Sequence, residues 1–108
     1  MPIYNKLVRD AIPRVIEKAG KELSMRILDE EEYKAEVKKK LGEELEEYKE
    51  AATNEEAIEE LADILELLHA ATKIHGSSIE ELEGVRKAKA EKRGGFEKRI
   101  FLIEVEDD

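Results

Sequence analysis

The sequence predicts a mainly α protein: a bundle of about four helices in a single domain spanning residues 1–108. Three capping-box patterns favour this class, because an Asp, Thr or Ser is followed three positions later by glutamate at each of three places. Glycines at positions 76 and 94 close two of the three segments that these patterns open, and the first segment ends where the second pattern begins. Within the segments, apolar residues recur at the spacing of one helix face. A chain of 108 residues can bury one core without disulfides.

The signals place the helices in order along the chain. The first is expected over residues 10–19, where Pro13 is tolerated in the first turn because no N–H is needed there. The second is expected over residues 29–52, and the third over residues 53–76. A fourth should run from residue 78 to the glycine pair that begins at 94.

Two short segments favour extended backbone instead. The segment 24–28 is short and includes β-branched and flexible apolar residues, and residues 100–105 are rich in β-forming side chains. We expect these segments, towards the two ends of the chain, to be able to pair as a small β element beside the helices.

Composition excludes several classes of function. The net charge of −9 and the pI of about 4.9 argue against a nucleic-acid partner, since such modules usually carry a basic surface. No apolar run is long enough for a membrane span, and the start lacks the apolar core of a signal peptide, so we expect a cytoplasmic protein without a membrane partner. The absence of cysteine excludes thiolate zinc sites, iron–sulfur clusters and cysteine nucleophiles.

Four carboxylates fall on the apolar faces of the second and third predicted helices. At about 100° per residue, Glu44 lies inside the apolar arc of its helix and Glu47 at the edge, whereas Glu46 points outward. Glu60 and Asp63 lie one turn apart among apolar residues of the next helix. Such a group cannot stay fully ionised without a cation, and hard oxygen ligands favour Mg²⁺, with Mn²⁺ also suitable. The alternative is a wet bundle edge that carries surface acids.

The fourth predicted helix is apolar at its start and cationic towards its end. Arg86, Lys89 and Arg93 continue the arc of its apolar residues. They could snorkel or pair with the acidic helices. They could instead bind phosphates, because metal-binding acids beside lysine and arginine are what phosphoryl chemistry requires. Two further basic residues, Lys6 and Arg9, lie near the start of the chain. They could contact a nucleotide or could simply be solvated charges.

These motifs resemble those of the MazG-type all-α nucleoside triphosphate pyrophosphatases. Residues 43–47 and 60–63 give the pattern EExxE…ExxD, with twelve residues between the two parts. Lys89 and Arg93 have the Lys-x-x-x-Arg spacing that this family places after its last core helix. Residues 4–10 and 93–96 resemble a branch often labelled phosphoribosyl-ATP pyrophosphohydrolase-like. The resemblance covers essentially the whole chain.

The resemblance implies a Mg²⁺-dependent hydrolase that cleaves nucleotides between the α and β phosphates, giving a monophosphate and pyrophosphate. It implies that Glu44, Glu47, Glu60 and Asp63 are the metal ligands, and that Lys89 and Arg93 contact phosphates. A metal-activated water needs a base, and either Glu44 or Glu47 could accept its proton. The number of metal ions, one or two, stays open.

The resemblance also implies a homodimer or homotetramer, and the third predicted helix favours assembly independently. Its apolar arc covers more than half of the circumference, which is wide for a surface helix of a small monomer. The residues that lie away from the acids are Leu61, Ile64, Leu65 and Leu68.

Three functions remain open from the sequence. We favour house-cleaning hydrolysis of aberrant nucleotides, since nothing in the chain selects a particular base. The first alternative is the hydrolysis of phosphoribosyl-ATP in histidine biosynthesis. The second is a non-catalytic helical module for oligomerisation or nucleotide binding, in which the acids only solvate the surface.

Overall fold

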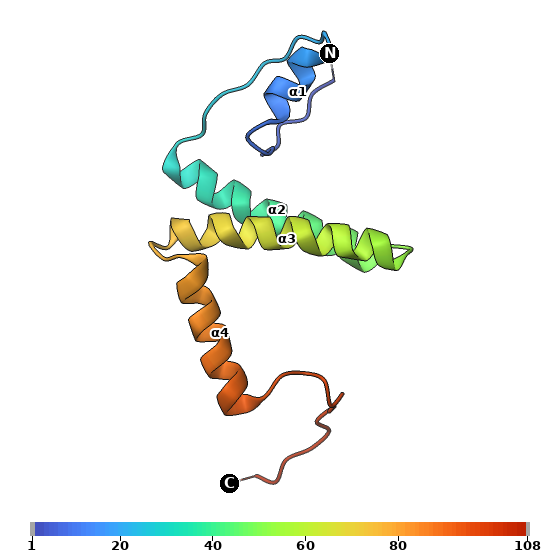
Figure 1. The fold of residues 1–108 in the computed structure, drawn as a ribbon, viewed down its shortest axis with the longest axis vertical. Helices are drawn as coiled ribbons and strands as arrows, with labels where there is room; N and C mark the ends of the chain where they lie inside the picture. Colours follow the sequence, from blue (N-terminus) through green and yellow to red (C-terminus); the bar gives the residue numbers. More distant parts are fainter. Residues whose placement is uncertain (1, 108) are drawn as a thin grey trace.

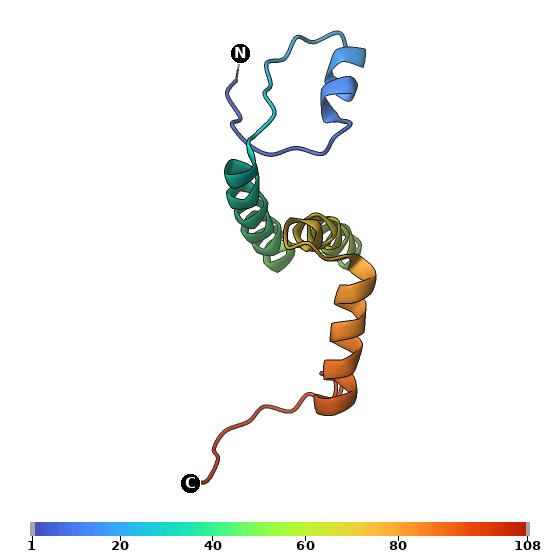
Figure 2. The ribbon, with the colours of Figure 1, turned by 90° about the vertical axis from the view of Figure 1, so that its left-hand side faces the viewer.

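Four helices form the framework of the computed structural model, which describes residues 2–107 (Figure 1). They are α1 (Ile12–Lys18), α2 (Glu30–Glu50), α3 (Asn54–Ile74) and α4 (Ile79–Arg93). A connection of three residues joins α2 to α3, and the two long helices lie side by side as an antiparallel hairpin (Figures 1 and 2). The mainly α class predicted from the sequence is confirmed. None of the helices within residues 2–107 combines the length and the apolar character needed to cross a membrane.

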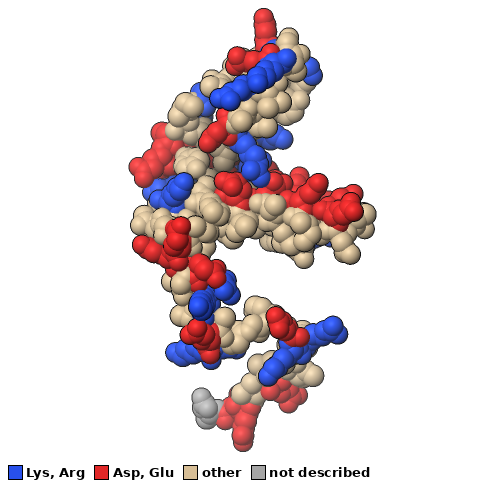
Figure 3. Space-filling model, viewed as in Figure 1, with Lys and Arg blue, Asp and Glu red and all other residues tan. Residues whose placement is uncertain are grey.

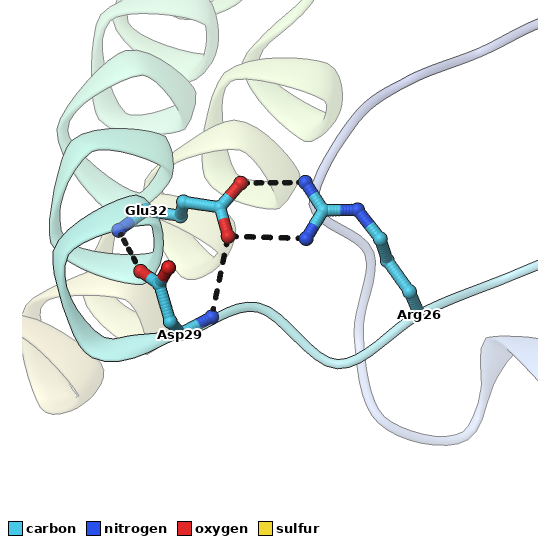
Figure 4. Close-up of polar contacts among 3 residues, drawn as sticks. All are labelled: Arg26, Asp29 and Glu32. Carbon is cyan, nitrogen blue, oxygen red and sulfur yellow. Dashed lines mark hydrogen bonds and ion pairs between the residues drawn. The ribbon is translucent and has the colours of Figure 1, made fainter.

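The predicted capping residues begin the three longer helices. At the start of α2, Asp29 Oδ1 accepts a hydrogen bond from the Glu32 backbone N–H at 2.8 Å, and Glu32 Oε1 accepts one from the Asp29 N–H at 3.4 Å (Figure 4). The hydroxyls of Thr53 and Ser78 accept backbone N–H groups in the same way, each at 3.1 Å. These bonds satisfy donors that a helix N-terminus leaves without partners, which is why the helices begin there.

An arginine outside α2 reinforces its capping box. Arg26 donates to both carboxylate oxygens of Glu32, with one of the N–H···O distances at 3.0 Å (Figure 4). The hydrogen bond from Arg26, with a smaller contribution from the Asp29 backbone, lowers the pKa of Glu32 to about 2. The loop before α2 is thus joined to the first turn of the helix.

The two predicted extended segments do not form strands in the part of the chain that the structure describes. Residues 24–28 and 100–105 lie at opposite ends of the molecule, so they cannot pair with each other (Figures 1 and 2). A strand needs a neighbour to satisfy its backbone N–H and C=O groups, and neither segment has one. The expectation of a small β element is therefore wrong for this chain alone, and side chains such as Phe101 stay 87% exposed.

The helices leave most of their apolar surface uncovered. Among residues 2–107, Val37 is the only large apolar side chain that is fully buried, with 1% of its surface exposed. The radius of gyration is 18.6 Å, against about 13 Å for a compact domain of this length. α4 leaves the end of α3 and runs away from the hairpin (Figures 1 and 2). Leu61 and Leu65 on α3 therefore remain exposed, as does Leu45 on α2.

We predict that Asp29→Ala lowers the free energy of unfolding by about 1 kcal/mol, because it removes the side-chain acceptor of the α2 N-cap. Lys39→Ala is the matched control: Lys39 is an exposed residue inside the same helix, and its change should stay within about 0.5 kcal/mol. Urea unfolding followed by circular dichroism measures both values. Equal effects of the two substitutions would show that the capping box contributes nothing specific.

Candidate metal centre

The α2–α3 hairpin brings three of the four predicted carboxylates together. Glu44 and Glu47 lie one turn apart on α2, and Glu60 faces them from α3. One carboxylate oxygen from each of the three lies within 4.8 Å of the other two. We call Glu44, Glu47 and Glu60 the carboxylate cluster. Its members are separated along the chain, so it exists only because the two helices pack against each other.

Burial differs among the members of the cluster. Glu44 is buried, with 8% of its surface exposed; Glu60 is half-buried and Glu47 is exposed. The Oε2 atoms of Glu44 and Glu60 are shielded from solvent, and no residue in the described part of the chain offers either a hydrogen bond. Buried carboxylate oxygens normally have a partner. These two atoms therefore call for a cation or for a proton shared between carboxylates.

The electrostatics of the cluster agree with this requirement. Burial raises the pKa of Glu44 to about 7, assisted by the proton that Glu44 could share with Glu60 or Glu47 and by the negative charges of Glu47 and Asp63. Hydrogen bonding with Glu44 acts to lower the pKa of Glu60, but burial and the repulsion of Glu47 and Asp63 outweigh it, so that pKa is also raised. The cluster thus holds a proton near neutral pH that a divalent cation would displace.

The fourth predicted ligand, Asp63, lies beside the cluster but has a different partner. Its Oδ1 accepts a hydrogen bond from an N–H of Arg9, which comes from the segment before α1. Asp63 is close enough for its charge to raise the pKa of both Glu44 and Glu60. The structure therefore places Asp63 at the edge of the candidate centre, held by an arginine.

The burial of Glu44 and Glu60 agrees with the inward positions that helical spacing predicts, whereas Glu47, predicted at the edge of the apolar arc, is exposed. Glu43, Glu46 and Glu59 have the same chemistry as the cluster and lie next to its members in the sequence, yet all three are exposed. Glu44 is buried and Glu60 is half-buried, one residue away in each case. The exposed glutamates therefore provide matched controls for every test of the cluster.

The basic residues predicted to bind phosphates lie elsewhere in the single chain. α4 carries Arg86, Lys89 and Arg93 away from the hairpin, and its basic end lies far from the carboxylates (Figures 1 and 2). Arg86 pairs instead with Glu83 on its own helix, with its Nε donating at 2.8 Å. One chain by itself does not bring these three cations to the carboxylate cluster.

A groove beside the cluster carries other cations, one of which the sequence analysis did not single out. It has a volume of about 310 Å³ and lies between the segment before α1 and the α2–α3 hairpin. Lys6 and Arg9 line it together with Lys40, which lies one helical turn before Glu44 and so shares its face. The four-residue spacing between Lys40 and Glu44 is the feature of the sequence that could have indicated this position. Figure 3 shows the mixture of basic and acidic side chains between α1 and the hairpin.

The donor set of the cluster suits a hard divalent cation. Carboxylate oxygens are the ligands that Mg²⁺ and Mn²⁺ prefer, and the two buried oxygens without donors are free to take that role. No histidine belongs to the cluster, and the chain contains no cysteine, so softer metals have little to bind. Glu44, Glu47 and Glu60 therefore fit a magnesium or manganese ion.

Comparison of the chain with protein-family models, with curated proteins and with solved structures finds no match. The assignment of a function therefore rests on the carboxylate cluster, on the groove beside it and on the chemistry that these side chains can support.

We predict that Glu44 makes the metal-free protein less stable as the pH rises from about 4.5 to 7. Its pKa is raised from 4.5 to about 7 on folding, so its stabilising contribution is complete below about 4.5 and is lost as the pH passes the folded value. Glu44→Gln should reduce this loss, leaving the part that comes from the raised pKa of Glu60, whereas Glu43→Gln should retain it in full. Urea unfolding at several pH values, with EDTA present, measures the effect. Parallel profiles for Glu44→Gln and the wild type would contradict the prediction.

Proposed function

We propose that this protein is a Mg²⁺-dependent nucleotide pyrophosphohydrolase that cleaves between the α and β phosphates and releases a nucleoside monophosphate and pyrophosphate. One observation carries the proposal: three carboxylates converge within 4.8 Å, and two of their buried oxygens have no hydrogen-bond donor within residues 2–107. The resemblance of residues 43–47 and 60–63 to the MazG-type motif supports the same reaction.

In this proposal Glu44, Glu47 and Glu60 would hold the metal, and Asp63, which lies beside them and is bonded to Arg9, could complete the set of ligands. A bound Mg²⁺ or Mn²⁺ would supply two things: a lower pKa for a neighbouring water and neutralisation of phosphate charge. The protein contributes the position of the site. Because the ligands come from two packed helices, their spacing is fixed by the hairpin rather than by a mobile loop.

Glu44 and Glu47 have different access to the attacking water. Glu44 is buried between the two helices, whereas Glu47 is exposed at the solvent edge of the cluster. Of the two, Glu47 is the better placed to accept a proton from a water that enters from solvent. Attack of that water on the α phosphorus breaks the bond to the β-phosphate oxygen, which leaves with pyrophosphate.

The leaving pyrophosphate is an anion and needs cationic partners. The sequence predicts this role for Arg86, Lys89 and Arg93, but α4 of the same chain leads away from the hairpin. They can act only if another copy presents its α4, or if α4 packs differently in an assembly. Assembly and phosphate binding by α4 are therefore linked parts of the proposal.

The substrates we favour are aberrant nucleotides, with phosphoribosyl-ATP as the alternative. A screen over normal, deoxy and oxidised nucleoside triphosphates and phosphoribosyl-ATP would decide between them. Released pyrophosphate is converted by an added inorganic pyrophosphatase and detected as phosphate. Turnover confined to phosphoribosyl-ATP would favour histidine biosynthesis. Absence of turnover on all of them, together with no response to Mg²⁺, would favour a non-catalytic helical module.

We predict that Glu44→Gln and Asp63→Asn each lower kcat/KM at least roughly a hundredfold, or ~2.7 kcal/mol in the barrier. Each substitution keeps the size of the side chain and removes a metal-binding charge. Glu46→Gln and Glu59→Gln are the matched controls and should change activity less than about threefold, because exposed charges contribute little. Steady-state kinetics and thermal shifts with millimolar Mg²⁺ test all four variants.

Equal damage from the two pairs of variants would mean that the carboxylate cluster is not the site of reaction. A ligand that binds only the native state must stabilise it. If neither Mg²⁺ nor Mn²⁺ changes the melting temperature of the wild type, with or without nucleotide, the protein does not bind the proposed metal.

We predict that the protein is a homodimer or homotetramer at micromolar concentration. A second copy would cover the apolar residues that the hairpin exposes, including Leu45, Leu61 and Leu65, the last of which is 52% exposed. Leu65→Glu should weaken the assembly, whereas Glu66→Gln next to it should not. Sedimentation velocity measures the mass. A single 12.4 kDa species for the wild type would contradict the prediction.

A further inference from the structure

We infer that the groove beside the carboxylate cluster binds the polyphosphate of the substrate, and that Lys6, Arg9 and Lys40 are its anion-binding side chains. The inference rests on the proposed function for its choice of ligand, a nucleotide polyphosphate with its metal. It differs from the assignment drawn from the motif, which gives this role to cations of α4.

The shape of the groove suits a small charged ligand. Its volume of about 310 Å³ falls at the lower end of the range for small-molecule sites. One wall is the segment before α1 with the start of that helix, where Val8 and Ile12 supply apolar surface. The other wall is the α2–α3 hairpin, where Leu67 faces the same space. These apolar side chains leave the polar contacts to a few charged groups.

The distribution of charge singles out this place on the molecule. Residues 29–66 contain sixteen acids and only five lysines, so the hairpin is strongly acidic. Lys40 is one of those five, and it lines the groove. Lys6 and Arg9 reach the same groove from the beginning of the chain. Three acids, Glu44, Asp63 and Glu66, line the same groove. The three cations balance them there, whereas the hairpin as a whole is strongly acidic.

Glu44 connects the groove with the cluster. It lines the groove, and one of its carboxylate oxygens belongs to the cluster with Glu47 and Glu60. An anion lying in the groove would therefore be adjacent to the metal ligands. Phosphoryl transfer needs this arrangement, in which acids hold the metal and basic side chains neutralise the remaining phosphate charge.

The hydrogen bond between Arg9 and Asp63 indicates what the groove can hold. One N–H of the Arg9 guanidinium donates to Asp63 Oδ1, and a guanidinium that pairs with a carboxylate can also pair with a phosphate. The pair is a weak contributor to the fold, since the side chains of Arg9 and Asp63 are 55% and 39% exposed. When Asp63 turns to a metal, the Arg9 guanidinium becomes available to a phosphate oxygen. Arg9 thus exchanges one anion for another.

The test measures the binding of inorganic tripolyphosphate by calorimetry, with excess Mg²⁺ and again with EDTA. Arg9→Ala should weaken binding about tenfold or more, because a charge-assisted hydrogen bond is lost, and Lys6→Ala and Lys40→Ala should weaken it in the same direction. Arg9→Lys should recover part of the loss. Arg14→Ala and Lys38→Ala are the matched controls, since both residues are exposed and neither lines the groove. Circular dichroism checks that every variant keeps its helices.

The response to Mg²⁺ alone separates this inference from the proposed function. Arg9→Ala should keep or increase the thermal shift produced by Mg²⁺, since Asp63 loses a competing partner. If the groove variants bind tripolyphosphate as tightly as the wild type while Mg²⁺ still stabilises the protein, the groove is not the anion site. The proposed function is then unaffected. A wild type without any response to Mg²⁺ rejects the proposed function instead. In that case the titrations of tripolyphosphate with EDTA still test whether the groove binds anions. If the Lys6, Arg9 and Lys40 variants bind tripolyphosphate as tightly as the wild type, the inference is wrong.

Lys89→Ala and Arg93→Ala complete the comparison. A loss of tripolyphosphate binding confined to these α4 variants would place the anion site there and overturn the inference. A loss in the groove variants supports it, whether or not α4 also contributes.

Discussion

Burial of the Glu44 carboxylate between two packed helices is the constraint on which the rest of the site depends. Water solvates this charge poorly, so burial raises the pKa of Glu44 to about 7 and favours either a bound proton or a nearby cation. Glu47 and Glu60 surround it with further negative charge, which strengthens the same requirement. A hairpin of two capped helices therefore carries a centre whose electrostatic cost a metal ion would relieve.

The same hairpin has two faces with different requirements. One face gathers the carboxylates, and the other exposes leucines such as Leu61 and Leu65 that a single chain does not cover. With Val37 as the only large apolar side chain fully buried among residues 2–107, the stability available from burial within one chain is small. The carboxylate cluster and the uncovered apolar face are the two features for which the proposed metal ion and the proposed second copy would supply partners.

The segment before α1 links the beginning of the chain to the centre of the hairpin. Arg9 reaches Asp63 across 54 positions of sequence, and Lys6 lies in the same groove. Because the contact is an exposed ion pair, it contributes little free energy to holding the segment in place. A segment held in this way can exchange its partner when a stronger anion arrives, which a cation fixed in a rigid core could not do.

The sequence by itself determined the helices and the direction of their acids. The caps at Asp29, Thr53 and Ser78 are local hydrogen bonds within three residues, and the burial of Glu44 against the exposure of Glu43 follows from helical periodicity. Only the tertiary structure decided which distant groups meet.

Helical spacing fixes where a side chain points on its own helix, but it contains no information about the angle at which α4 leaves α3 or about which segment covers the hairpin. For that reason the sequence placed the phosphate-binding cations on α4, whereas the folded chain gathers Lys6, Arg9 and Lys40 beside the acids. The segments 24–28 and 100–105 failed as strands for the same reason, since a strand is defined by a partner that local sequence cannot supply.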